Sequence, residues 1–271
     1  MNKFSPHLWI LALALFTLVG CSTLKLESTW KDRDITLDGK GGEWLGAKYY
    51  FEDSAISVGL INDEQYLYVS MMTENPMIRA QIMRQGLTIW LDPDGGKNKT
   101  FGIKFPLGKR GEEQEGERMD PPAMMDEMIR EEIMQKLQES MTELEILGRD
   151  EKVLAKMDIE DTKGIEVKMR NVGGTFVYEL KVPLVSREEY PFTIGANPGD
   201  TIGVGFLSPK MQMKRPNKMR GMGGMPPGGS GGMPPGGGMR GYGMKPMMPQ
   251  DLKIWAKVQL ASGSTPTLTF F

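Results

Sequence analysis

The sequence predicts a mainly β fold into which one amphipathic helix and one long low-complexity loop are inserted. Short runs rich in β-branched and aromatic residues, separated by Asp, Gly and Asn clusters, extend over most of the chain. An acidic, methionine-rich stretch without aromatic residues interrupts these runs, and a stretch dominated by Met, Gly and Pro interrupts them again. Without the N-terminal leader and the low-complexity stretch, the chain has about the length of one domain, roughly 100–200 residues.

The first 20 residues have the layout of a bacterial secretory leader. Lys3 precedes an apolar run over 8–19, which as a helix would span roughly 18 Å and fall short of the ~30 Å hydrocarbon core of a membrane. The run ends in Leu18-Val19-Gly20-Cys21, which resembles the bacterial lipobox. We therefore expect a signal peptide over 1–20 and a lipidated tether over 21–34.

Lipidation of Cys21 would place the protein in the bacterial cell envelope. The resemblance implies that palmitate-type acyl chains are attached to the thiol, and two such chains are enough for stable anchoring. Ser22, rather than Asp, follows the cysteine, which favours the outer membrane over the inner one. The alternative is an ordinary secreted protein with a cysteine at its cleavage site.

The composition argues against several functional classes. The net charge is −2, which creates no field to attract nucleic acid. The chain has one cysteine and one histidine, Cys21 and His7, so the mature protein would have no internal disulfide, no histidine base and no histidine ligand for haem. We predict that the protein is not an enzyme. Catalysis by carboxylates alone stays open, although acidic pairs such as Glu131-Glu132 are typical of a solvated face.

Nine runs have the composition of β-strands. The run over 65–72 follows the turn signal Asn62-Asp63-Glu64 and is dense enough in aromatic and β-branched residues for a central, buried strand. The run over 174–183 alternates apolar and polar residues, as expected of a strand with one face on the core. The predicted strands cover 48–52, 55–61, 66–73, 86–92, 100–106, 165–169, 174–183, 201–207 and 252–260.

Two inserts separate these strands. In the first, about 108–147, Asp120-Pro121-Pro122 suits a helix start, and apolar residues then recur every three or four positions, which predicts an amphipathic helix over about 122–145. The second, about 210–249, contains ten methionines, seven basic residues and no acidic residue, and it predicts a disordered loop between the last two strands.

Several motifs, taken in order, resemble landmarks of the family 9 carbohydrate-binding modules and the wider DOMON-like group. The resemblance covers roughly 35–207 plus the final strand, and it implies an antiparallel β-sandwich over 35–271 that binds a carbohydrate without catalysis. The segments that carry it are Ile35-Thr36-Leu37-Asp38-Gly39 with Trp44, Ile61 to Val69, Gly86 to Gly96, Tyr178 to Leu184, and Gly199 to Gly203.

Three tryptophans are candidate ligand-binding residues: Trp44, Trp90 and Trp255. Sugar-binding modules hold the apolar face of a pyranose against aromatic rings. The alternative is that these rings pack in the core or against a sheet.

Two candidate metal sites follow from ligand chemistry. Asp92, Asp94 and Asn98 place oxygen ligands in one turn, which suits Ca²⁺, although the same side chains could simply cap their own backbone. Methionine clusters such as Met211-x-Met213 and Met222-x-x-Met225 could bind Cu(I), or could belong to a flexible loop that contacts the envelope. No other cofactor is predicted.

Three functions therefore remain in order of preference: a surface lipoprotein that binds carbohydrate, a structural or assembly lipoprotein that contacts envelope proteins through its inserts, and a metal-handling protein. The expected partners are the membrane, a glycan and an envelope protein. The first function requires an exposed aromatic platform, whereas the second predicts that the three tryptophans are buried.

Overall fold

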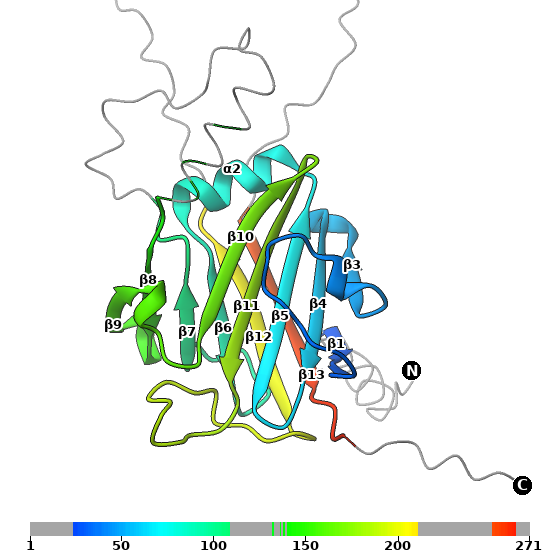
Figure 1. Ribbon diagram of the computed structural model, residues 1–271, viewed down its shortest axis with the longest axis vertical. Coiled ribbons are helices and arrows are strands. Elements are labelled where there is room, and N and C mark those ends of the chain that lie inside the picture. Colours follow the sequence, from blue (N-terminus) through cyan, green and yellow to red (C-terminus); the bar gives the residue numbers. More distant parts are fainter. Residues whose placement is uncertain are drawn as a thin grey trace, which may run out of the picture.

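Two β-sheets packed face to face form the fold (Figure 1). The computed structural model describes residues 24–108, 132, 136, 138, 140–210 and 251–263. The first sheet has the order β1 (Leu24–Glu27), β13 (Leu252–Gln259), β12 (Thr201–Ser208), β6 (Thr88–Asp92), β7 (Phe101–Lys104), β8 (Glu143–Leu147), β9 (Val153–Asp158). The second has the order β10 (Glu166–Val172), β11 (Thr175–Pro183), β5 (Tyr66–Thr73), β4 (Ile56–Asn62), β2 (Thr29–Trp30), and β3 (Lys48–Phe51) also pairs with β4.

Alternation along the strands builds the core between the sheets. In β11, Phe176, Tyr178, Leu180 and Val182 point inward and are buried, as the alternating pattern predicts. The opposite sheet supplies residues such as Val204 to the same core. The predicted β-sandwich is confirmed, and all nine predicted strands are present with boundaries that differ by at most three residues.

The N-terminal strands differ from expectation in two ways. Residues 24–30 fall within the expected tether, yet β1 pairs with β13 and β2 pairs with β4, so these residues belong to the sandwich. Both pairings are parallel, so the sheets are not purely antiparallel. Leu26 is buried in the core, which explains why this segment folds onto the sandwich.

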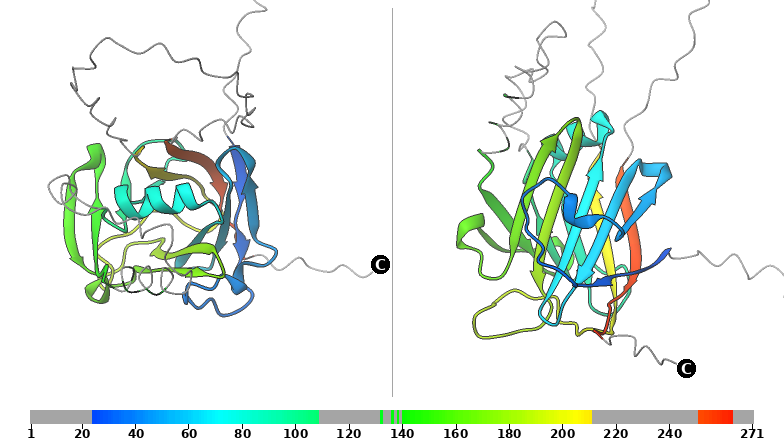
Figure 2. Two further views of the ribbon diagram at one scale, coloured as in Figure 1. Left: turned by 90° about the horizontal axis from the view of Figure 1, so that it is seen from above. Right: turned by 45° about the vertical axis from the view of Figure 1, so that its right-hand side comes forward.

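One helix, α2 (Pro76–Gln85), was not predicted and closes one end of the sandwich (Figures 1 and 2). Its start follows the usual rules: the Asn75 side chain accepts hydrogen bonds from the Met77 and Ile78 amides, and Pro76 is the first helical residue. The helix contacts β5 of one sheet and β12 of the other. The Gln81 side chain donates to the carbonyl oxygen of Ser208 at 2.9 Å.

The two predicted inserts lie largely outside the described residues. Within the first, Glu132, Lys136 and Gln138 are helical, in agreement with the predicted helix. The helix cannot reach residue 145 as expected, because β8 begins at Glu143 and forms a hairpin with β9. The second insert, 211–250, and its predicted disorder fall outside the described residues.

A loop over residues 31–47 covers part of the outer face of the second sheet (Figure 1). Trp44 on this loop is fully buried against sheet residues Ile61, Tyr68, Met72 and Val177. A second, smaller hydrophobic cluster therefore lies outside the sandwich core, and it fixes the loop on the sheet.

Candidate functional site

The outer face of the second sheet is organised in rows of side chains that run across β3, β4, β5 and β11. Strand register places Tyr50 opposite Ser57, Ser57 opposite Met72, and Met72 opposite Val177. The next row toward the loop contains Lys48, Gly59, Ser70 and Glu179. The first row is the floor of an open groove, and the second lies under the loop.

The Trp44 ring packs on the second row because Gly59 leaves room for it. A Cβ atom on Gly59 would lie 2.5 Å from Cε3 of Trp44 and 2.5 Å from Oγ of Ser70. The indole Nε1 donates a hydrogen bond of 2.9 Å to Oε1 of Glu179. The packing of this ring on the sheet and its hydrogen bond to Glu179 thus help to hold the loop in place.

The groove has a volume of about 780 Å³, which is in the size range of small-molecule sites. Its floor is apolar, with Met72 and Val177 buried beneath it. Tyr50, on the edge strand β3, is 67% exposed and forms one wall. The residues that line it are Lys40, Gly41, Lys48, Tyr50, Ala55, Ser57, Met72, Thr73, Glu74, Asn75, Pro76, Met77, Val172, Thr175 and Val177.

Polar groups surround this apolar floor. Lys40 and Lys48 lie on the loop and on β3, while Glu74 and Asn75 lie where β5 passes into α2. The hydroxyl of Thr73 donates to the carbonyl oxygen of Ala55 at 2.8 Å and accepts from the Asn75 amide, which fixes the start of α2. The groove therefore combines an exposed ring, an apolar floor and several hydrogen-bonding groups.

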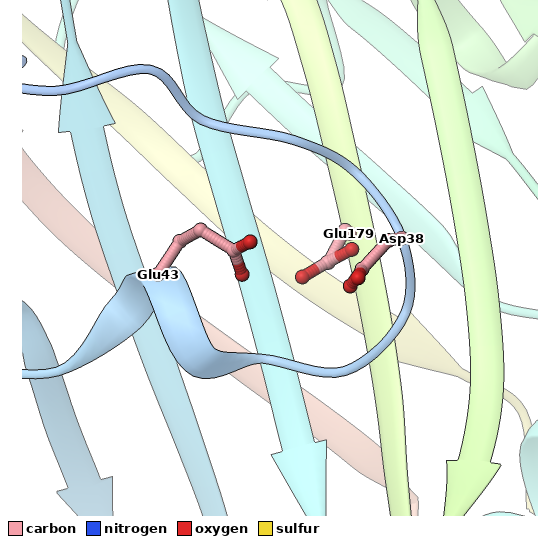
Figure 3. Close-up of side chains that lie close together, drawn as sticks. All are labelled: Asp38, Glu43 and Glu179. Carbon is pink, nitrogen blue, oxygen red and sulfur yellow. The ribbon is translucent and has the colours of Figure 1, made fainter.

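Three carboxylates, those of Asp38, Glu43 and Glu179, meet beside the groove (Figure 3). Asp38 and Glu43 come from the 31–47 loop, and Glu179 comes from β11. One oxygen of each side chain lies within 4.8 Å of one oxygen of both others. Among the described residues this is the one group of three or more potential acidic, His or Cys metal ligands.

Glu179 is a fully buried acid whose partners are neutral donors. Oε1 accepts from the Trp44 indole, and Oε2 accepts from the Gly39 amide at 2.7 Å. Burial raises the pKa of Glu179, these two hydrogen bonds lower it, and the negative charges of Glu43 and Asp38 raise it, with a net increase. Lys40 pairs with Asp38 at 2.6 Å, and this ion pair lowers the pKa of Asp38.

The carboxylate cluster was not predicted from the sequence. Glu179 occupies a polar, outward position in an alternating strand, which normally indicates a solvent-exposed side chain. Only the folding of the 31–47 loop over that face buries it. The one available signal was Trp44 close in sequence to two acidic residues, Asp38 and Glu43.

The structure does not place the predicted tryptophans together on an exposed platform. Trp44 is 0% exposed and Trp90 is 2% exposed, so the expectation that these two rings face a ligand does not fit. Trp90 and Trp255 lie in one row on the outer face of the first sheet, packed over Gly102 and Gly205. The reason is steric: each glycine leaves the space that a flat indole ring fills. Only Trp255 of the three is partly exposed.

The predicted calcium turn has the geometry of a self-capping loop. Asp92 is buried and accepts hydrogen bonds from the Asp94 amide, the Asn98 amide and the Thr100 hydroxyl. Asp94 and Asn98 are exposed. Two of these three contacts are the backbone caps of the alternative reading, and calcium binding here stays a prediction.

Other predicted sites fall on residues that the structure does not describe. These are the lipidation site Cys21 and the methionine clusters at Met211, Met213, Met222 and Met225. Within the described part of the chain, no helix is both long enough and apolar enough to cross a membrane.

Comparisons with known proteins give a distant structural likeness. No family model matches the sequence, and no curated protein matches it. Two solved structures similar to this chain are of a family 9 carbohydrate-binding module from Caldicellulosiruptor kristjanssonii, one in complex with glucose and one in complex with cellotriose. Each shares 10% identity with this chain at a TM-score of 0.33 and covers 68% of it, and the match covers 77% and 75% of those chains, respectively. This is the family whose motifs the sequence resembles, and the β-sandwich itself is established by the two packed sheets of this chain.

Proposed function

We propose that the protein is a membrane-anchored extracytoplasmic lipoprotein whose β-sandwich is a non-catalytic module that binds carbohydrate in the groove beside Tyr50. The observation that carries the proposal is the combination in one groove of an exposed aromatic ring, an apolar floor and peripheral polar groups. A pyranose presents an apolar C–H face for the Tyr50 ring and hydroxyls for Lys48, Glu74 and Asn75.

The length of the anchor supports a module held close to the membrane. β1 begins at Leu24, three residues after the proposed lipidated Cys21. At ~3.3–3.6 Å per residue, this linker reaches about 10 Å. The module would therefore lie against the bilayer surface and bind glycans of its own envelope or of the immediate surroundings.

The carbohydrate proposal is tested by a glycan array probed with the full chain in a mild, non-glycosidic detergent. A hit is then titrated with the Tyr50→Ala variant. Loss of one ring contact is expected to weaken binding about three- to tenfold, since an aromatic contact contributes on the order of 1 kcal/mol. Leu45→Ala is the matched control, because Leu45 is 72% exposed and does not line the groove. A folded protein with no hit, or equal losses in both variants, would contradict the proposal.

The anchoring is tested separately in cells that synthesise the full chain. Metabolic labelling with a palmitate analogue should mark the protein, and Cys21→Ser should abolish the label and release the protein from the membrane fraction. Labelling that persists in the Cys21→Ser variant would remove the lipoprotein assignment.

A scaffold function is the second candidate, and the burial of Trp44 and Trp90 favours it. In that case the sandwich positions its inserts against envelope proteins and binds no sugar. A blank glycan array, together with cross-linking of the wild-type chain to an envelope protein through residues of the inserts, would support this function instead.

A further inference from the structure

The outer face of β13 combines a partly exposed tryptophan with positive charge. Lys253, Trp255 and Lys257 point to this face, since they alternate with the buried residues of the strand. The Trp255 ring packs over Gly205 of β12 and keeps part of its surface exposed. Both lysines are exposed, and no ion pair within the described part of the chain reaches either of them. The face is therefore both aromatic and basic.

A third lysine, on the neighbouring strand β1, adds to this charge. The register of β1 and β13 places Lys25 opposite Lys257. Paired strands lie about 4.8 Å apart, so these two like charges repel each other. The acidic residues nearest along the two strands, Asp251 and Glu27, lie at the ends of this face and form no ion pair with the lysines. An anion bound on the face would relieve the repulsion.

The start of β1 brings the proposed lipid anchor to this face. Leu24 lies opposite Ala256 and the two strands run parallel, so β1 begins almost at the level of Trp255. Three residues connect Leu24 to Cys21, a reach of about 10 Å. This step rests on the proposed lipidation of Cys21, whereas the charge and the ring do not. An acylated Cys21 would keep the aromatic and basic face within a short distance of lipid headgroups.

We propose that Lys25, Lys253, Trp255 and Lys257 form a surface that docks on the anionic headgroups of the membrane that holds the anchor. Lysines near such a surface are attracted by its negative potential, and a tryptophan ring suits the headgroup level because it has an apolar body and a polar N–H. The groove beside Tyr50 lies on the outer face of the opposite sheet (Figure 2). Docking through β1 and β13 therefore turns the groove away from the bilayer, where a ligand can reach it.

Quenching of tryptophan fluorescence by brominated lipids tests contact between Trp255 and the membrane. The lipidated full chain is reconstituted in vesicles of brominated phosphatidylcholine, with or without phosphatidylglycerol. We expect additional quenching in the vesicles that contain phosphatidylglycerol and its loss at high salt, because salt screens exposed charges. Trp255→Phe should remove this additional quenching. Trp30→Phe is the matched control and should retain it, because Trp30 is also partly exposed but lies in the other sheet.

A double variant tests the charges. Lys25→Gln combined with Lys257→Gln should lower the ratio of docked to undocked protein roughly 25-fold, since each lysine near an anionic surface changes it about fivefold. Lys152→Gln combined with Lys163→Gln removes the same charge from two exposed lysines outside β1 and β13 and should leave the quenching unchanged. Equal quenching in both kinds of vesicle, or additional quenching that survives in Trp255→Phe or in the Lys25 and Lys257 double variant, would overturn the proposal.

Failure of the docking surface can be distinguished from failure of the anchor. An acylated chain whose Trp255 is not quenched would keep the anchor and remove the docking surface. If Cys21 carries no acyl label, the full chain is mixed with preformed vesicles instead. Flotation with the vesicles that contain phosphatidylglycerol, lost in the Lys25 and Lys257 double variant, would then support the surface without the anchor, and absence of flotation would remove both.

Discussion

Gly59 shows how a single missing side chain positions the loop beside the groove. Any Cβ at this position would lie 2.5 Å from the Trp44 ring, and Trp44 is fully buried and cannot move aside freely. The same device recurs on the other sheet, where Gly102 and Gly205 leave room for the rings of Trp90 and Trp255. On the outer face of each sheet, a tryptophan ring thus packs in the space that a glycine leaves.

The Gly59→Ala variant is expected to be less stable than the wild type by about 1–3 kcal/mol, the usual cost of overpacking. Urea unfolding followed by tryptophan fluorescence measures this difference. Gly42→Ala is the matched control, because a Cβ there has no neighbour within 4 Å and the backbone does not have a positive φ. Equal stabilities of the two variants would show that Trp44 does not lie in the slot described.

The contacts of a side chain could be predicted from the sequence only where its partners are a few residues away in the chain. The capping of the 92–98 turn was one of the two alternatives considered, because an Asp reaches amides two to six residues away. Trp44 is buried because it packs on β4, which begins at Ile56, and Trp90 is buried because it packs on Gly102. The residues next to each tryptophan in the sequence therefore do not reveal whether the ring is exposed. Glu179 is the clearest example, since its burial results from a loop about 140 residues earlier in the chain.

At the scale of elements, nine of the thirteen described strands were predicted, whereas β1, β2, β8, β9 and helix α2 were missed. α2 has little amphipathic character, because it lies across the end of the sandwich and contacts one strand of each sheet. Its signals were the Asn75-Pro76 start and Gly86 at its end. β8 was missed because Met141 and Leu144 continue the helical spacing of the residues before them. A five-residue strand is too short for its periodicity to distinguish it from the end of a helix.

Helix α2 should depend on its N-cap. Replacement of Asn75 by Ala removes the acceptor for the Met77 and Ile78 amides and is expected to cost about 1 kcal/mol. Asn75→Asp retains an acceptor and should restore most of that stability, as measured by thermal unfolding with circular dichroism. An Asn75→Asp variant as unstable as Asn75→Ala would mean that contacts of the Asn75 amide group other than capping matter here.

At the scale of the whole molecule, the N-terminal segment joins the two sheets along one edge. β1 belongs to one sheet and β2 to the other, and Ser28 lies between them. The Ser28 amide donates to Gln259, while the Ala261 amide donates to Oδ1 of the fully buried Asn62 at 2.9 Å. The sequence could not predict this seam, because its partners are separated by about 200–230 residues and the segment alone resembles a linker.

The seam gives the last prediction. Asn62→Ala removes one of the two acceptors of the Ala261 amide, the acceptor of the Ser28 hydroxyl and the donor to the Ala261 carbonyl. Loss of these part-buried hydrogen bonds is expected to cost about 1–3 kcal/mol. The exposed Asn197 offers a matched control, and Asn197→Ala should change the free energy of unfolding by less than about 0.5 kcal/mol. Hydrogen exchange adds the spatial test: in Asn62→Ala, protection should fall in both β1 and β2, since the seam holds strands of both sheets. A loss of protection confined to β4, where Asn62 itself lies, would show that the hydrogen bonds of Asn62 do not hold β1 and β2 in place. The two sheets would then be joined by the hydrophobic core alone.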